Sequence, residues 1–151
     1  MKDLKYVFAY ITPLGAVMGL WLQGVWVFFT PFFAFILVPF LETILPVAKQ
    51  NLSKKELISK DKNKFFNVLL YLNIPIVYGL VGCFLWSLAY REYTLTELVG
   101  LTISLGIVVG ANGINVAHEL GHRKLRFERV FGKILLLPAL YMHFFIEHNF
   151  G

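Results

Sequence analysis

The chain has 151 residues, of which 58 % are hydrophobic and only 15 % are charged, and its mean hydropathy is +0.67. Soluble domains carry roughly a quarter charged residues, so this composition excludes an ordinary soluble domain and indicates a membrane protein. The formal net charge of +5 comes from basic residues beside apolar blocks, which indicates membrane topology and not nucleic-acid binding. The single cysteine, Cys83, lies inside such a block. It offers no disulfide or cysteine-based metal site and is expected to be buried.

Four apolar blocks are close to the length of about 20 residues that a membrane-spanning helix needs. They cover residues 6–22, 31–48, 65–90 and 98–117. No small-residue cleavage site follows the first block, so we expect this helix to be retained and not removed as a signal peptide. A fifth apolar segment, residues 134–146, has only 13 residues. It is too short to span and is expected to be re-entrant or a truncated span.

Local signals predict where these helices begin and bend. Thr30 followed by Pro31 is typical of a helix start, and Pro39 predicts a kink within the second block. Thr94 and Glu97 have the spacing of a capping box, in which each residue bonds to the other's backbone N–H. This pair therefore predicts the start of the fourth helix.

The distribution of basic residues predicts the orientation. Every lysine and arginine except Arg91 lies before the first block or within segments 49–64 and 123–133. Because cytoplasmic loops carry an excess of these residues, the N-terminus and both segments are expected on the cytoplasmic side. The predicted fold is thus an all-α polytopic transmembrane bundle of about four spans plus the fifth segment. Residues 1–151 would form the N-terminal part of a single integral-membrane domain.

The fourth block ends in a pattern that predicts metal chemistry. His118 and His122 are four residues apart, so on a helix they lie about 40° and about 6 Å apart and can reach one metal. Glu119, between them, could be a base, a partner of the ligands or a solvated acid. Two helix-terminal histidines without a metal are the alternative.

A second cluster follows the fifth segment and strengthens the metal hypothesis. His143, Glu147 and His148 interrupt an aromatic stretch, and all four histidines of the chain fall within its last 34 residues. A lone histidine on an aromatic face, such as His143, is more often a packing residue than a ligand. The two clusters together favour a histidine-ligated di-iron oxygenase, while a membrane zinc peptidase using His118, Glu119 and His122 remains an alternative.

Small and amide side chains precede the first pair of histidines. Gly106 and Gly110 form a small-xxx-small pair, which predicts close approach of another helix. Asn112 and Asn115 are expected to bond either to the imidazoles or across helices. These residues would position the histidines without doing chemistry.

Two strings, residues 112–122 and 143–151, resemble the first two histidine motifs of membrane-bound alkane 1-monooxygenases, which belong with the fatty-acid desaturases and hydroxylases. The resemblance extends over the whole chain in the order of its helices and loops. It implies two iron ions at the cytoplasmic end of a six-helix bundle, with His118, His122 and His148 as ligands. Glu119 and Glu147 would support catalysis by holding the ligands, and His143 is not assigned as a ligand.

The resemblance also implies terminal hydroxylation of alkanes to 1-alkanols in a bacterial inner membrane. The alkane would arrive from the membrane lipids, and O₂ would be the oxidant. Electrons would come from rubredoxin and rubredoxin reductase. We expect the acidic rubredoxin to dock on the basic face formed by residues 123–133, so that reversing the charges of Arg126 and Arg129 would slow reduction.

The family's second motif continues with two histidines after the glycine, whereas this sequence ends at Gly151. We therefore expect an N-terminal fragment that alone neither assembles the two-iron centre nor hydroxylates alkanes. A related lipid or alkyl-aromatic desaturase or hydroxylase is the next alternative, followed by the zinc peptidase and a scaffold without metal.

Overall fold

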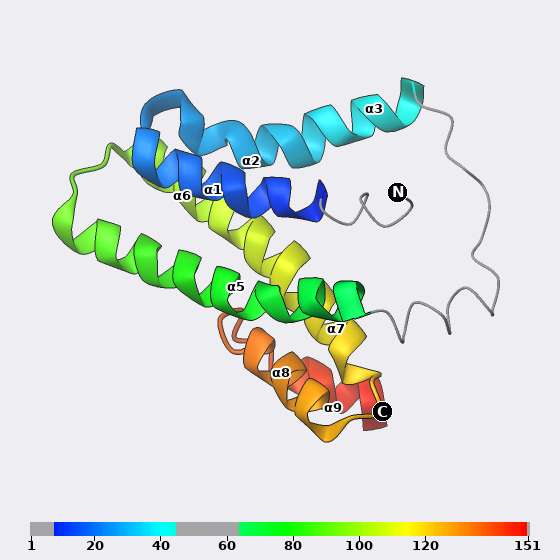
Figure 1. Cartoon of the computed structure of the whole chain (residues 1–151). Coiled ribbons are helices and arrows are strands. Elements are labelled where there is room, and N and C mark those ends of the chain that lie inside the picture. Colours follow the sequence, from blue (N-terminus) through cyan, green and yellow to red (C-terminus); the bar gives the residue numbers. More distant parts are fainter. Residues whose placement is uncertain (1–7, 45–63, 151) are drawn as a thin grey trace.

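The computed structural model describes residues 8–44 and 64–150, with side chains up to His148, and every regular element in these ranges is helical (Figure 1). The predicted all-α membrane fold is thereby confirmed. The predicted cytoplasmic loop lies outside the described residues apart from Lys64, as do Lys2 and Lys5. The helices α1 to α7 form a bundle, and α8 and α9 form a small hairpin at one end of it (Figure 1).

The first two predicted spans form an antiparallel pair. α1 (Ile11–Leu22) reverses at Gln23 and Gly24, which both have φ of +55°. The chain then returns through the 3₁₀ turn η2 (Gly24–Phe28), α2 (Phe29–Phe32), the π-helical η3 (Phe33–Leu37) and α3 (Val38–Ile44).

The predicted helix start at Thr30 is wrong, because the helical path already runs through this position from Gly24 and no side chain caps α2. The hydroxyl of Thr30 instead donates to the backbone carbonyl of Thr12 on α1, at 3.2 Å. The irregularity predicted at Pro39 takes the form of the π-helical turn just before it. A proline ring crowds the carbonyl four residues earlier, and a wider π turn relieves such crowding.

Two long helices complete the bundle. α5 (Lys64–Tyr90) is followed by a continuous run of α6 (Leu95–Val108), the π-helical η4 (Val109–Ile114) and α7 (Asn115–Gly121). The predicted capping box is confirmed, since Thr94 and Glu97 bond reciprocally at the start of α6. Three helices are long and apolar enough to cross a membrane: Gly24–Ile44, Lys64–Tyr90 and Leu95–Gly121. The first predicted span corresponds to a shorter apolar helix, Phe8–Leu22.

The short segment predicted at 134–146 is divided between two helices. α8 (Arg126–Leu136) ends in a turn that contains Leu140 at φ +52°, and α9 (His143–Phe150) then folds back toward α7. α8 is amphipathic: it buries Glu128, Gly132, Leu135 and Leu136 and leaves its basic residues exposed. Such a helix typically lies along a membrane surface and does not cross the membrane.

Two hydrophobic cores hold the molecule together. The bundle core joins α1, η2, α5 and α6, and the hairpin core joins α5, η4, α7, α8 and α9. Their buried members are Ala16, Leu20, Val27, Leu80, Leu101 and Val108 in the bundle core, and Leu70, Val77, Val109, Ala117, Leu120, Leu135, Leu136 and Phe145 in the hairpin core.

Two expectations about packing are wrong. Cys83 is exposed on α5 instead of buried. Neither Gly106 nor Gly110 has a described neighbour within 4 Å of the place where a Cβ would stand. Close approach occurs at Gly100 and Gly132 instead, where a Cβ would lie 2.4 Å from a Val27 methyl and 2.9 Å from the Ala117 carbonyl oxygen.

Candidate metal centre

Three histidines converge where α7 meets α9. His118 lies on α7, His122 directly follows α7 as its C-terminal cap, and His148 lies on α9. Their Nε2 atoms lie 2.9 Å from one another in all three pairs. Among the described residues these three form the group of side chains arranged to hold a metal ion. We call them the histidine trio.

Ring packing fixes the trio on the α9 side. Phe144 stacks on the ring of His148 with centroids 5.1 Å apart and meets the edge of His118 at 5.9 Å. The next residue, Phe145, is buried in the hairpin core. α9 therefore turns one aromatic face toward the histidines and anchors the other in apolar packing.

The packing of α8 fixes the trio on the α7 side. Gly132 lets α8 approach the backbone of Ala117 and Gly121 closely, one on each side of His118 in sequence. Leu120, between the two ligating positions of α7, is fully buried in the hairpin core. α7 is therefore held between α8 and α9 over the turn that carries both of its histidines.

The arrangement of donors fits a cation. A neutral imidazole Nε2 either donates or accepts a hydrogen bond. In a triangle of three such nitrogens, at least one pair faces donor to donor or lone pair to lone pair, whatever the tautomers. A cation that accepts all three lone pairs removes this conflict, and imidazole suits zinc, copper, iron and nickel.

The spacing is compatible with one shared metal ion. Nitrogens 2.9 Å apart are close enough for an ion about 2.1 Å from each of them to contact all three. Three imidazoles leave further coordination positions of such an ion for other ligands.

The acidic residues predicted to support the site are placed differently from each other. Glu119 is half exposed and its Oε1 lies 3.3 Å from Nη2 of Arg123, one turn further along the chain. Glu147 is exposed on α9, next to His148. The role predicted for each carboxylate stays a prediction.

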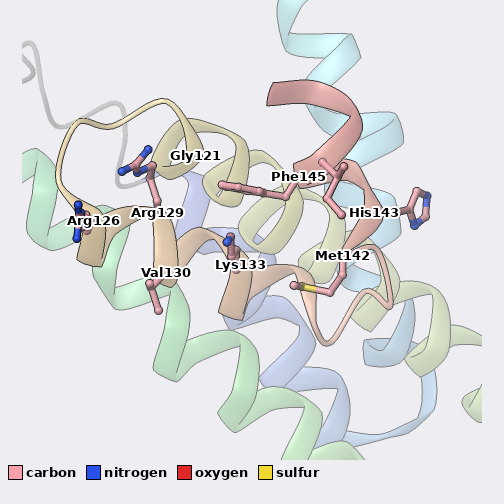
Figure 2. Close-up of a pocket in the computed structure, with 9 residues that line it drawn as sticks. Gly121, Arg126, Arg129, Val130, Lys133, Met142, His143 and Phe145 are labelled. Atoms are coloured by element: carbon pink, nitrogen blue, oxygen red, sulfur yellow. The ribbon is translucent and has the colours of Figure 1, made fainter. Parts of the chain in front are cut away.

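His143 lies apart from the trio. Its exposed ring packs edge-on against Tyr141, with centroids 4.6 Å apart. Figure 2 shows it pointing outward at the rim of a cavity between α8 and α9. The structure thus brings together the three histidines predicted as ligands and leaves out the one predicted as a packing residue.

Asn112 bonds across helices, which decides between the two roles predicted for it. Its Oδ1 accepts from the hydroxyl of Thr12 at 3.0 Å, and its Nδ2 donates to Asn73 Oδ1 at 2.9 Å and to the Ala9 carbonyl at 3.3 Å. This polar node ties α1, α5 and η4 together two turns before His118. Asn115, in contrast, is exposed.

Sequence reasoning missed two supports of the site. Phe144 gave no signal, since an aromatic residue in an aromatic segment is ordinary. Glu128 is 3 % exposed and accepts a hydrogen bond from Tyr71 at 2.7 Å, which fastens α8 to α5. Glu128 lies on the face of α8 that is otherwise apolar, and this position in the sequence could have indicated a buried acid.

Comparison with known proteins gives a consistent family of relatives, although no family model matches the chain. The chain is 31 % identical to alkane 1-monooxygenase 1 of Alcanivorax borkumensis and 32 % identical to alkane 1-monooxygenase of Pseudomonas putida, in each case over 99 % of this chain. A xylene/toluene monooxygenase hydroxylase component of Pseudomonas putida is 25 % identical over 91 % of this chain. The chain spans 38 % of the length of the first two relatives. Over nearly its whole length, the chain is therefore similar to bacterial alkane 1-monooxygenases.

Proposed function

We propose that this chain supplies part of an alkane 1-monooxygenase, and that the histidine trio contributes ligands to a centre of two iron ions. The observation that carries the proposal is the trio itself, with three Nε2 atoms 2.9 Å apart at the end of a 27-residue apolar helix. The similarity to alkane 1-monooxygenases over 99 % of the chain supports the same function.

The proposed reaction inserts one oxygen atom of O₂ into a terminal C–H bond of a medium- or long-chain alkane. Two electrons and two protons reduce the other oxygen atom to water, so that the products are a 1-alkanol and water. Iron, when bound, would supply the redox chemistry of this insertion. Three imidazoles fill only part of the coordination positions of two ions, so further ligands would complete the centre.

The position of the trio suits a substrate that dissolves in lipid. The long helix Leu95–Gly121 spans about 40 Å at 1.5 Å per residue, which exceeds the roughly 30 Å hydrocarbon core of a bilayer. Its histidine end therefore reaches the interface, where lipid and water meet. An alkane can approach from the lipid side and water-soluble rubredoxin, with its reductase, can deliver electrons from the cytoplasm of a bacterial cell.

The zinc peptidase is less well supported. Such an enzyme needs Glu119 as a base beside the metal, but Glu119 points along the helix to Arg123. A related hydroxylase acting on alkyl-aromatic substrates is favoured more, because one relative is named a xylene/toluene monooxygenase component.

Metal binding by the chain in detergent tests the first part of the proposal. Anaerobic titration with Fe²⁺ should show binding that His118→Ala weakens on the order of 100-fold. His143→Ala is the matched control, because it removes an exposed imidazole outside the trio, and it should bind Fe²⁺ as the parent does. Equal binding by both variants would remove the trio from the metal site.

Activity tests the second part in a chimaera, in which residues 1–151 replace the matching region of the Pseudomonas putida relative. With rubredoxin, its reductase and octane, the chimaera should form 1-octanol, and His118→Ala should abolish the product while His143→Ala retains it. Proteolysis that depends on bound zinc, without 1-octanol, would favour the peptidase.

A further inference from the structure

A cavity of about 790 Å³ lies between α8 and α9. Phe144 and His148 of α9 pack against His118, whereas Met142 and Ile146 line the cavity. None of the three histidines of the trio lines the cavity, whose lining residues Figure 2 shows, so the cavity is separate from the metal centre.

One wall of the cavity carries three positive charges. Arg126, Arg129 and Lys133 are spaced by three and four residues along α8 and share one face of this helix. Within the described part of the chain, no carboxylate pairs with any of the three, and Lys133 instead places its Nζ 4.6 Å from the centre of the Phe145 ring. No acidic residue lines the cavity, so this wall attracts an anion.

Apart from His143 at its rim, the rest of the cavity is apolar and open. Val130, Met142 and Ile146 line it and are 50 %, 37 % and 64 % exposed. Leu137 and Leu140 continue this apolar surface along the turn and are 49 % and 89 % exposed. A molecule that satisfies both walls is an amphiphile with a negative head and a hydrocarbon body.

The location supplies such a molecule. The cavity lies beside Gly121, where the long apolar helix ends, and α8 has the basic and apolar faces of a helix at a membrane surface. Basic pockets next to membrane-spanning helices typically hold anionic lipid headgroups. The volume is in the range of roughly 300 to 1,000 Å³ that is usual for small-ligand sites.

We propose that this cavity binds the headgroup of an anionic phospholipid. The phosphate lies among Arg126, Arg129 and Lys133, and the acyl chains leave the cavity past Val130 and Ile146. A protein partner fits this feature less well, because a stable protein interface buries about 800 Å² on each side and not one concave pocket. The proposal does not depend on the proposed oxygenase function.

The test uses the 151-residue chain in nanodiscs of phosphatidylcholine with a minor fraction of phosphatidylglycerol. Spin-labelled lipids of both kinds report which one the protein retains. The parent chain should retain phosphatidylglycerol in preference. The double variant Arg126→Gln, Arg129→Gln should weaken this preference on the order of thirtyfold, because each cation near the surface contributes to the attraction.

Two further variants separate a built site from general surface charge. Lys64→Gln with Lys124→Gln removes the same charge at exposed positions outside the cavity and should leave the preference unchanged. Val130→Trp fills the cavity without changing the charge and should abolish the preference, while circular dichroism verifies that each variant keeps its helices. An equal loss in both charge variants, or a preference that survives Val130→Trp, would overturn the proposal.

Two competitors identify the source of the bound anion. An excess of inorganic phosphate should leave the bound phosphatidylglycerol in place, and displacement would show a site for free phosphate instead. Rubredoxin binding to the parent chain and to the Arg126→Gln, Arg129→Gln variant is measured in parallel, because both arginines also belong to the basic face on which rubredoxin is expected to dock. If the variant lost rubredoxin binding and kept its lipid preference, the three cations would belong to a protein docking face and the lipid proposal would fall.

Discussion

The two ends of the molecule are built by different means. In the bundle, the spans Gly24–Ile44 and Lys64–Tyr90 bury only 11 % and 22 % of their most apolar windows within the protein, while Leu95–Gly121 buries 39 %. At the hairpin end, α7, α8 and α9 pack around Leu120, Leu135 and Phe145 beneath the histidine trio. The bundle thus leaves most of its apolar surface for lipid, and the hairpin encloses its own core.

This difference shows what determines the arrangement of the helices in each region. Lipid chains are as apolar as leucine, so burial alone gives the bundle little reason to choose one arrangement of its helices. Polar side chains and close backbone contacts make that choice instead. The hairpin helices α8 and α9 are too short to cross a membrane. Hydrophobic burial within the hairpin can hold three imidazoles within hydrogen-bond distance of one another.

If polar contacts determine how the bundle helices pack, replacing Asn112 should have the largest effect on stability. Asn112→Leu removes three hydrogen bonds and leaves Thr12 and Asn73 without these partners in the interior. We expect the free energy of unfolding to fall by about 3 kcal/mol. Equilibrium unfolding in mixed detergent micelles, followed by circular dichroism, measures this change.

Asn115→Leu is the matched control for this prediction. Asn115 lies three residues further along the same helix and is exposed, so its replacement should leave the free energy of unfolding nearly unchanged. A similar loss in both variants would mean that any asparagine in this helix stabilises it, and that the node does not specify the packing of α1, α5 and η4.

The same contrast explains which features the sequence could predict. Block lengths and the Thr94–Glu97 spacing are local signals, so the membrane helices and the capping box were predictable. The i, i+4 spacing of His118 and His122 is local as well. His148 joins them only because the turn near Leu140 reverses the chain, and the family resemblance, not the spacing, included this residue in the predicted ligand set.

The wrong predictions at Gly106, Gly110 and Thr30 concern contacts between helices. Gly106 and Gly110 have the pattern of a packing motif, but the neighbouring helices approach at Gly100 and Gly132. Thr30 has the form of a cap, but its hydroxyl bonds to α1. A sequence pattern indicates where a helix could approach closely. The position of the neighbouring helix decides where it does.

Two glycines, one in the hairpin and one in the bundle, allow the two regions to be compared by substitutions with a smaller effect on stability. At Gly132 a Cβ would lie 2.9 Å from the Ala117 carbonyl oxygen, in the hairpin, and at Gly100 it would lie 2.4 Å from a Val27 methyl, in the bundle. Replacement by alanine should lower the free energy of unfolding by about 2 kcal/mol in each case. Only Gly132→Ala should weaken Fe²⁺ binding, on the order of tenfold, since it moves α8 against the turn that carries His118.

The pair is measured by the same unfolding experiment and by Fe²⁺ titration of each variant. If Gly100→Ala weakened Fe²⁺ binding as much as Gly132→Ala does, the two regions would be one cooperative unit. Unchanged metal binding in both variants would instead show that the trio tolerates a displacement of α8.

The capping box offers the smallest and most local test. The hydroxyl of Thr94 accepts from the Glu97 N–H at 3.3 Å, and the Glu97 carboxylate accepts from the Thr94 N–H at 2.9 Å and from the Gly24 N–H at 2.8 Å. The box therefore also fastens the reversal between α1 and η2. Thr94→Ala should lower the free energy of unfolding by about 1 kcal/mol, measured by the same unfolding experiment.

Thr96→Ala is the control for this prediction. It replaces an exposed threonine within the same turn and should lower the free energy of unfolding by less. Because the box lies at the end of the bundle away from the hairpin, Fe²⁺ binding should stay at the parent value, and a loss of binding in Thr94→Ala would mean that the start of α6 sets the position of the histidines on α7.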